Sequence, residues 1–282
     1  MCIRKTDFYE KNVIIFLKSE NNCLQKALNV VKYNSVDFTE RIYIDFMQQV
    51  KYRRVLLKLS GEALSAGNDG ILNFDFITEI AGVLKKCRDV GVQIGIIVGA
   101  GNIWRGRQGG KMDRNRADSM GMLATTINAL ALQDTFIQAG LDSVVMTAVD
   151  MHTFADHYTA RDAVNALENG KTVIFGCGLG SPFFSTDTAA VLRAAEIGAD
   201  AVLMAKNIDG VYSSDPRRDP SAVRYDEITY KEILDKELKA LDLTATTFCM
   251  ENHITVYAFE LKDPMNIYRV VTGEKIGTEI HG

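Results

Sequence analysis

The sequence lacks a long apolar run and lacks an excess of positive charge. Its longest apolar stretches, around 13–17 and 91–101, are too short to cross a bilayer, so we expect a soluble, cytoplasmic protein without a membrane partner. The formal net charge of -4 over 282 residues argues against nucleic acid as the main partner, because binding to its phosphates favours a strong basic excess. Any basic patch must therefore be local.

Cysteine and histidine are both scarce. The five cysteines include no CxxC pair, and the four histidines show no metal-ligand spacing and no recognisable triad. This composition predicts thiols in a reducing cytosol and argues against a site built on a histidine or cysteine nucleophile. The sequence predicts no metal site formed by protein side chains alone.

Two common nucleotide-binding patterns are also missing. The phosphate loop GxxxxGK[ST] does not occur. The stretch GAGNIWRG at 99–106 comes close to the dinucleotide pattern GxGxxG, but Trp104 stands where close helix packing demands a third glycine. We therefore reject a NAD site.

Short β-branched runs alternate with helical patterns along most of the chain. Strands are predicted over 55–59, 93–98, 143–147, 172–175, 201–204 and 254–259, and helices over 74–89, 118–139, 161–169, 186–197, 230–238 and 243–252. Glycines follow several of these helices, where a left-handed cap is favoured: Gly91, Gly140, Gly170 and Gly198. The pattern predicts an α/β fold with a doubly wound, mainly parallel sheet flanked by helices, which binds ligands beyond the carboxyl ends of its strands.

The first 51 residues differ from the rest of the chain. They are rich in Asn, Lys and aromatic residues and show no sustained period. We interpret 1–51 as an N-terminal extension without an assigned role, and 52–282 as the catalytic domain.

Two loops at predicted strand ends carry glycine beside a cation. Lys58 ends the first strand and is followed by Ser60 and Gly61, so its ammonium can reach a phosphate while the glycine admits backbone N–H groups. Alone, such a lysine is more often a strand-edge charge. In the second loop Arg105 follows the glycines closely enough to bridge phosphates, whereas the other basic residues up to 116 fit a solvated or subunit-contacting loop. Asp118 is predicted to begin the next helix, as a favourable first-turn charge or as an acceptor for ribose hydroxyls.

Two further loops combine turn residues with aromatic side chains. The loop 178–187 ends in Ser185 and Thr186, natural helix N-caps, and a helix N-terminus is a ready anion site. If an anion binds there, we expect Asp187 to orient Lys58 or to organise Mg²⁺-bound phosphate. The loop 206–216 reads either as a hairpin-like excursion or as an adenosine site with Tyr212 on the base and Asp215 at the sugar.

Taken together, five motifs resemble the bacterial uridylate (UMP) kinases of the amino acid kinase superfamily: KLSGEAL at 58–64, GAGNIWRG at 99–106, RADSMGMLAT at 116–125, GSPFFSTDTAA at 180–190 and DGVYSSDP at 209–216. The resemblance covers 52–282. It implies an amino acid kinase-like fold and phosphoryl transfer from ATP to UMP in pyrimidine nucleotide biosynthesis.

The resemblance also implies the site residues. ATP would be bound by Lys58, Leu59, Ser60, Gly61, Gly101, Arg105, Lys206, Asn207, Tyr212 and Asp215. UMP would be bound by Ala100, Asp118, Leu179, Gly180, Ser181, Pro182, Phe183, Phe184, Ser185 and Thr186. The implied catalytic residues are Lys58, Arg105, Asp187 and Asp242, with Mg²⁺ carried by ATP. A homohexamer with GTP and UTP as effectors is implied in the same way.

Two alternatives stay open from the residues. One is another enzyme of the superfamily, with a carboxylate or carbamate acceptor, which would share the ATP half of the site. The other is a nucleotide-sensing regulatory protein that uses the basic loop 105–116 as a contact surface. A preference for UMP as acceptor would distinguish a UMP kinase from the first alternative. Kinase turnover of any kind would distinguish it from the second.

Overall fold

The centre of the fold is a group of apolar strands that are buried on both faces. The computed structural model describes residues 50–65, 70–105 and 110–282. It places four such strands side by side: β5 (Thr172–Gly176), β2 (Gln93–Val98), β1 (Arg54–Leu59) and β6 (Ala201–Lys206). Nearly all of their residues are buried, as expected for parallel strands covered by helices on both sides.

The whole sheet, within the described residues, has nine strands in the order β4-β3-β5-β2-β1-β6-β10-β11-β9. The outer strands are β3 (Ser143–Thr147), β4 (Asp156–His157), β9 (Glu227–Thr229), β10 (Thr255–Glu260) and β11 (Thr278–His281). All neighbours pair in parallel except β10 and β11. A separate antiparallel pair is formed by β7 (Val211–Tyr212) and β8 (Arg224–Tyr225).

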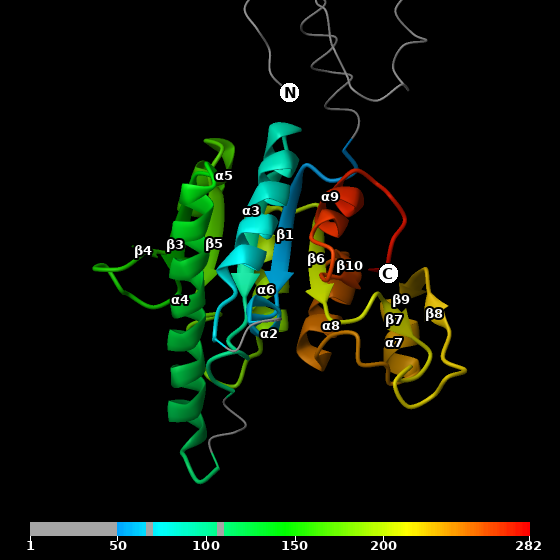
Figure 1. Cartoon of the computed structure of the whole chain (residues 1–282). Coiled ribbons are helices and arrows are strands. Elements are labelled where there is room, and N and C mark those ends of the chain that lie inside the picture. The colour runs from blue at the N-terminus through cyan, green and yellow to red at the C-terminus, as the bar shows by residue number, and fades with distance from the viewer. Residues whose placement is uncertain (1–49, 66–69, 106–109) are drawn as a thin grey trace, which may run out of the picture. The chain divides into compact units, whose positions relative to one another are not determined.

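Helices cover both faces of the sheet, which gives three layers (Figure 1). One face packs against α3 (Phe74–Asp89), α4 (Arg114–Gln138) and α9 (Met265–Val271). The other packs against α5 (Ala160–Glu168), α6 (Thr186–Ile197), α7 (Tyr230–Asp235) and α8 (Leu243–Glu251). The short helix α2 (Gly61–Leu64) directly follows β1. In the described part of the chain, every helix is too short or too polar to cross a membrane.

The predicted doubly wound, mainly parallel sheet is confirmed. Strands 93–98 and 143–147 and helices 74–89 and 186–197 have the predicted bounds, and the other predicted elements differ at one or both ends. The glycines predicted to end helices all have positive φ: Gly91, Gly140, Gly170 and Gly198.

The predicted start of the helix over 118–139 is wrong. α4 begins at Arg114, because the Asp113 side chain accepts a hydrogen bond from the Arg116 N–H (3.2 Å) and caps the helix one turn earlier. Asp118 therefore lies in the second turn rather than at the first. The early start also carries the first half of α4 beyond the ends of the strands, as Figure 1 shows.

The predicted extension 1–51 lies almost entirely outside the described residues. Val50–Gly282 form one compact unit, and Lys51 belongs to it, since its N–H donates to Val271 O (2.7 Å). Within this unit Cys87, Cys177 and Cys249 are buried free thiols.

The carboxyl ends of the central strands meet at one level of the sheet. Lys58 in β1 lies opposite Ile97 of β2 on one side and opposite Met204 of β6 on the other. After β1 the chain adds strands on the β2 side of the sheet, and it first adds a strand on the other side of β1 at β6. The sheet thus reverses its strand order at β1, which is the position where open α/β sheets bind ligands.

Candidate active site

The loops after β1 and β2 touch through glycine. A Cβ atom on Gly61 would lie 2.5 Å from Asn102 Oδ1 and 2.7 Å from both Gly101 N and Gly99 O. The Gly99 N–H donates to Leu59 O (2.9 Å), which continues the β1–β2 pairing into the loops. Only glycine allows this approach, so the first helical turn after Lys58 rests directly on the loop that leads to Arg105.

A pair of asparagines holds the second loop in place. Asn128, fully buried in α4, donates to Gly99 O (2.8 Å) and exchanges hydrogen bonds with Asn102 (2.8 and 3.0 Å). Asn102 also donates to Ile71 O (2.6 Å). The sequence reasoning missed both residues. The one available signal is an amide in the otherwise apolar helix segment that contains Asn128, where burial demands hydrogen-bond partners.

Three charged side chains gather where β1, β6 and α6 meet. Lys58 Nζ lies 3.0 Å from Asp187 Oδ1, and both side chains are largely shielded, with 16% and 20% exposure. Lys206, at the end of β6, donates from Nζ to Ala240 O. Burial lowers the pKa of Lys206; Asp187 opposes this effect and Lys58 adds to it. The cluster combines two lysine side chains with one carboxylate, an arrangement suited to an anionic ligand.

The N-terminus of α6 lies beside this cluster. The Ser185 hydroxyl accepts hydrogen bonds from the N–H groups of Asp187 (3.0 Å) and Thr188 (3.2 Å), so Ser185 is the cap that the sequence predicts. The prediction that Thr186 is also a cap is wrong, because Thr186 is the first helical residue. The helix thus presents its positive end next to Lys58.

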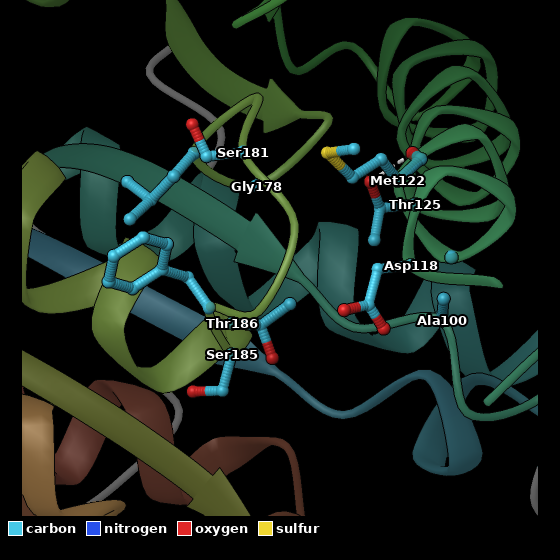
Figure 2. Close-up of a pocket in the computed structure, with 11 residues that line it drawn as sticks. Ala100, Asp118, Met122, Thr125, Gly178, Ser181, Ser185 and Thr186 are labelled. Atoms are coloured by element: carbon cyan, nitrogen blue, oxygen red, sulfur yellow. Dashed lines mark hydrogen bonds between the residues drawn. The ribbon is translucent and has the colours of Figure 1, made fainter. Parts of the chain in front are cut away.

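A pocket opens on the other side of Thr186. One wall is α4 and the opposite wall is the loop before α6, as Figure 2 shows. Several residues predicted to bind UMP line it: Ala100, Asp118, Leu179, Ser181, Phe184, Ser185 and Thr186. Among the other predicted residues, Gly180, Pro182 and Phe183 are not part of its lining. Four lining residues were missed: Gly121, Met122, Thr125 and Gly178.

Comparison with known proteins identifies this arrangement. The sequence profile of the "Amino acid kinase family" matches residues 53–259, which contain β1, the glycine loops, the charged cluster and the pocket. The chain belongs to the amino acid kinase family.

Within the amino acid kinases, the similar proteins are uridylate kinases, and the predicted resemblance is confirmed. The "Uridylate kinase" of Pediococcus pentosaceus is 50% identical over 239 residues, covering 84% of this chain and 99% of the relative. The solved UMP kinase of Bacillus anthracis has a TM-score of 0.79 at 35% identity, over 82% of this chain and 96% of its own. That of Ureaplasma parvum has a TM-score of 0.78 at 36% identity, over 82% of this chain and 100% of its own.

Asp242 lies between two helix N-termini of this amino acid kinase. Its carboxylate caps α8 by accepting the Ala245 N–H (2.8 Å), and it also accepts the hydroxyls of Ser185 and Thr188, the latter at 3.0 Å. Asp242 therefore joins α8 to the start of α6. Asp242 thus contacts Ser185, which lines the pocket, but is not itself part of the lining.

Arg105 lies on the outer side of the glycine loops. Its guanidinium pairs with Glu62 of α2, and both side chains are about half exposed. A Cβ atom on Gly101 would lie 3.5 Å from Arg105 Nε, so the guanidinium lies next to the glycine that the family resemblance assigns to the ATP site. Residues 106–109 of the predicted basic loop lie outside the described residues.

The residues predicted to surround adenosine lie on a hairpin beyond β6. The Tyr212 hydroxyl donates to Asp209 (2.8 Å), which also pairs with Arg224 (3.0 Å). Asp215 accepts the Arg217 N–H (3.0 Å) and starts the next turn. The predicted hairpin is present, the adenosine site on it stays a prediction, and Lys206 connects its base to the charged cluster. Asn207 follows Lys206 at this base.

Proposed function

We propose that this protein transfers the γ-phosphoryl group of ATP to UMP and releases ADP and UDP. The observation that carries the proposal is the position of the Lys58–Asp187 pair at the start of α6, one residue away from Thr186 in the lining of a separate pocket. A phosphoryl donor at the cluster and a nucleotide acceptor in the pocket would meet at this helix end. The uridylate kinase relatives support UMP as the acceptor.

The residues fit the chemistry of this transfer. The second pKa of a phosphate monoester is about 6, so the UMP phosphate is mostly dianionic near neutral pH and attacks without a general base. The remaining barrier is the repulsion between two anions and the charge that spreads over the transferred group. Lys58, Arg105 and the N–H groups of the glycine loops and of α6 would offset that charge from fixed positions.

Asp187 would keep the Lys58 ammonium aimed at the donor phosphates. It is also the carboxylate best placed for Mg²⁺ carried by ATP, because it lies at the cluster itself. Mg²⁺ usually keeps several waters and binds through one or two carboxylates together with substrate phosphates, so Asp187 alone could serve it. When bound, Mg²⁺ would neutralise part of the phosphate charge.

Finer properties of the protein extend the same proposal. We infer a cytoplasmic enzyme of pyrimidine nucleotide biosynthesis that assembles as a homohexamer and responds to GTP and UTP. For assembly, support comes from Met120, Leu123 and Ile127, which form an exposed apolar stripe along α4. Location, pathway and effectors are supported by the family resemblance alone.

The two alternatives are not favoured. A carboxylate or carbamate kinase would share the cluster, but the similar proteins described above are uridylate kinases. A regulatory protein would not need the Lys58–Asp187 pair beside a second pocket.

A screen of acceptors tests the proposal directly. Purified protein is incubated with Mg²⁺-ATP and one of UMP, CMP, glutamate, aspartate or carbamate, and ADP release is followed in a coupled assay. We expect the highest kcat/KM with UMP. Turnover without preference for UMP would overturn the acceptor assignment, and no turnover with any acceptor would overturn the kinase assignment.

A further inference from the structure

The Asp118 carboxylate in the pocket wall is held from one side. Its Oδ2 atom accepts two hydrogen bonds, from Arg114 Nε (2.7 Å) and from the Phe183 N–H (2.9 Å). Among the described residues, Oδ1 has no hydrogen-bond partner. Figure 2 shows the carboxylate directed into the space between α4 and the loop that carries Ser185 and Thr186. One oxygen of Asp118 is therefore anchored, and the other is available to a ligand.

Arg114 reaches the same loop through a second contact. Its guanidinium lies over the Phe183 ring at 5.4 Å from the centroid, a cation–π distance. Arg114 is thus bound to both partners of the Phe183–Asp118 hydrogen bond. These three residues form a clasp between the first turns of α4 and the loop before α6, which we call the Arg114 clasp.

The backbone at Phe183 shows that the clasp is specific. Phe183 has φ of 71°, in the left-handed region that a bulky residue enters only at a cost. This conformation points its N–H at Asp118 while the ring, 63% exposed, lies under Arg114. Arg114 is about half exposed, and an i,i+4 ion pair that involves such a side chain adds little to the stability of a helix. The contact is therefore poorly explained by helix stability.

We propose that Arg114 is a positioning residue for the acceptor nucleotide. By holding Oδ2, Arg114 and the Phe183 N–H turn Oδ1 of Asp118 into the pocket, where it accepts hydrogen bonds from the ribose hydroxyls. Arg114 itself touches neither substrate. This inference rests on the proposed function, since it requires a nucleoside monophosphate in the pocket.

Steady-state kinetics of three variants test the clasp. Arg114→Gln should raise KM for UMP about tenfold, because a charge-assisted hydrogen bond that orients a ligand-binding group is lost. KM for ATP and kcat should stay near the wild-type values. In Asp118→Asn the acceptor KM rises as well, and Arg114→Gln added to Asp118→Asn should cause no further rise, because Arg114 acts through that carboxylate.

Two controls separate the clasp from general effects. Arg116→Gln removes the same charge from the same helical turn, but the described residues give the Arg116 side chain no ion pair, so its KM for UMP should match the wild type. Arg114→Lys keeps the charge without the planar fork and should give an intermediate KM.

The possible results divide clearly. An unchanged KM in Arg114→Gln, an equal rise in Arg116→Gln, or additive effects with Asp118→Asn would each overturn the positioning role while leaving the UMP kinase assignment intact. A wild-type protein that does not phosphorylate UMP would overturn both. Should Arg114→Gln not fold, the comparison of Arg114→Lys with the wild type decides the question by the same criterion.

Discussion

The pocket side and the hairpin side of the candidate site are held in different ways. Around the pocket and the glycine loops, Asn128 is fully buried and Asp242 is partly buried, and both bind backbone groups or helix ends. On the β7–β8 hairpin, Tyr212, Asp209 and Arg224 bind one another near the surface. Buried hydrogen bonds are costly to break, whereas exposed pairs contribute little. Substitutions on the first side should thus affect stability and turnover together, and those on the hairpin should affect ATP binding alone.

The largest expected effect comes from the cation at the junction of the two sides. Lys58→Met removes the ammonium and keeps the apolar stem, so kcat should fall about 10²- to 10³-fold, as for loss of one transition-state contact. Steady-state turnover of UMP measures it. Lys262→Met, at an exposed position, is the control and should be neutral. Turnover near the wild-type rate in folded Lys58→Met would remove Lys58 from the mechanism.

The glycine contact gives the next test, on the pocket side. Gly61→Ala should lower kcat/KM by about tenfold or more and destabilise the fold by about 1–3 kcal/mol, because its Cβ would overlap Gly99 and Gly101. Turnover and chemical denaturation report the two effects. Gly82→Ala, in α3 with nothing within 4 Å of the new Cβ, should instead stabilise the protein by about 0.5–1 kcal/mol. Identical behaviour of the two variants would contradict the role of the contact.

Asp242 distinguishes positioning from direct catalysis. Asp242→Ala removes the cap of α8 and its links to Ser185 and Thr188, so the free energy of unfolding should fall by about 1 kcal/mol, with a smaller loss of turnover than in Gly61→Ala. Thermal unfolding and turnover measure the two quantities. A fall in kcat by orders of magnitude with an unchanged Tm would show that Asp242 acts on the reacting groups themselves.

The predictable part of the fold is the part with strong local signals. Central strands such as β2 are uninterrupted apolar runs, and α6 starts at a serine cap, so their bounds follow from residue type. β9 and β11 were missed because each has at most four residues and is held by pairing with a neighbour distant in sequence. The short helix α9 was missed for the same reason of length.

The candidate site also has a part that residue type predicts and a part that it does not. Glycine, lysine and cap residues at strand ends identify the phosphate-handling loops without a structure. The Asn102–Asn128 pair and the Arg114 clasp depend on how α4 lies against loops from other parts of the chain. Asp113 lies in a charged stretch without apolar periodicity, so the early start of α4, and with it the location of Asp118, could not be read from the pattern.

The smallest expected effect lies on the hairpin. Tyr212→Phe removes the hydroxyl that binds Asp209 and keeps the ring, so KM for ATP should rise by no more than about twofold, as expected for the loss of one partly buried hydrogen bond. Tyr212→Ala also removes the aromatic face and should raise it further, with KM for UMP and Tm unchanged in both variants. ATP titrations at saturating UMP measure the difference. A loss of stability in Tyr212→Phe comparable to that of Asp242→Ala would mean that the hairpin is as firmly built as the pocket side, and the contrast between the two sides would not hold.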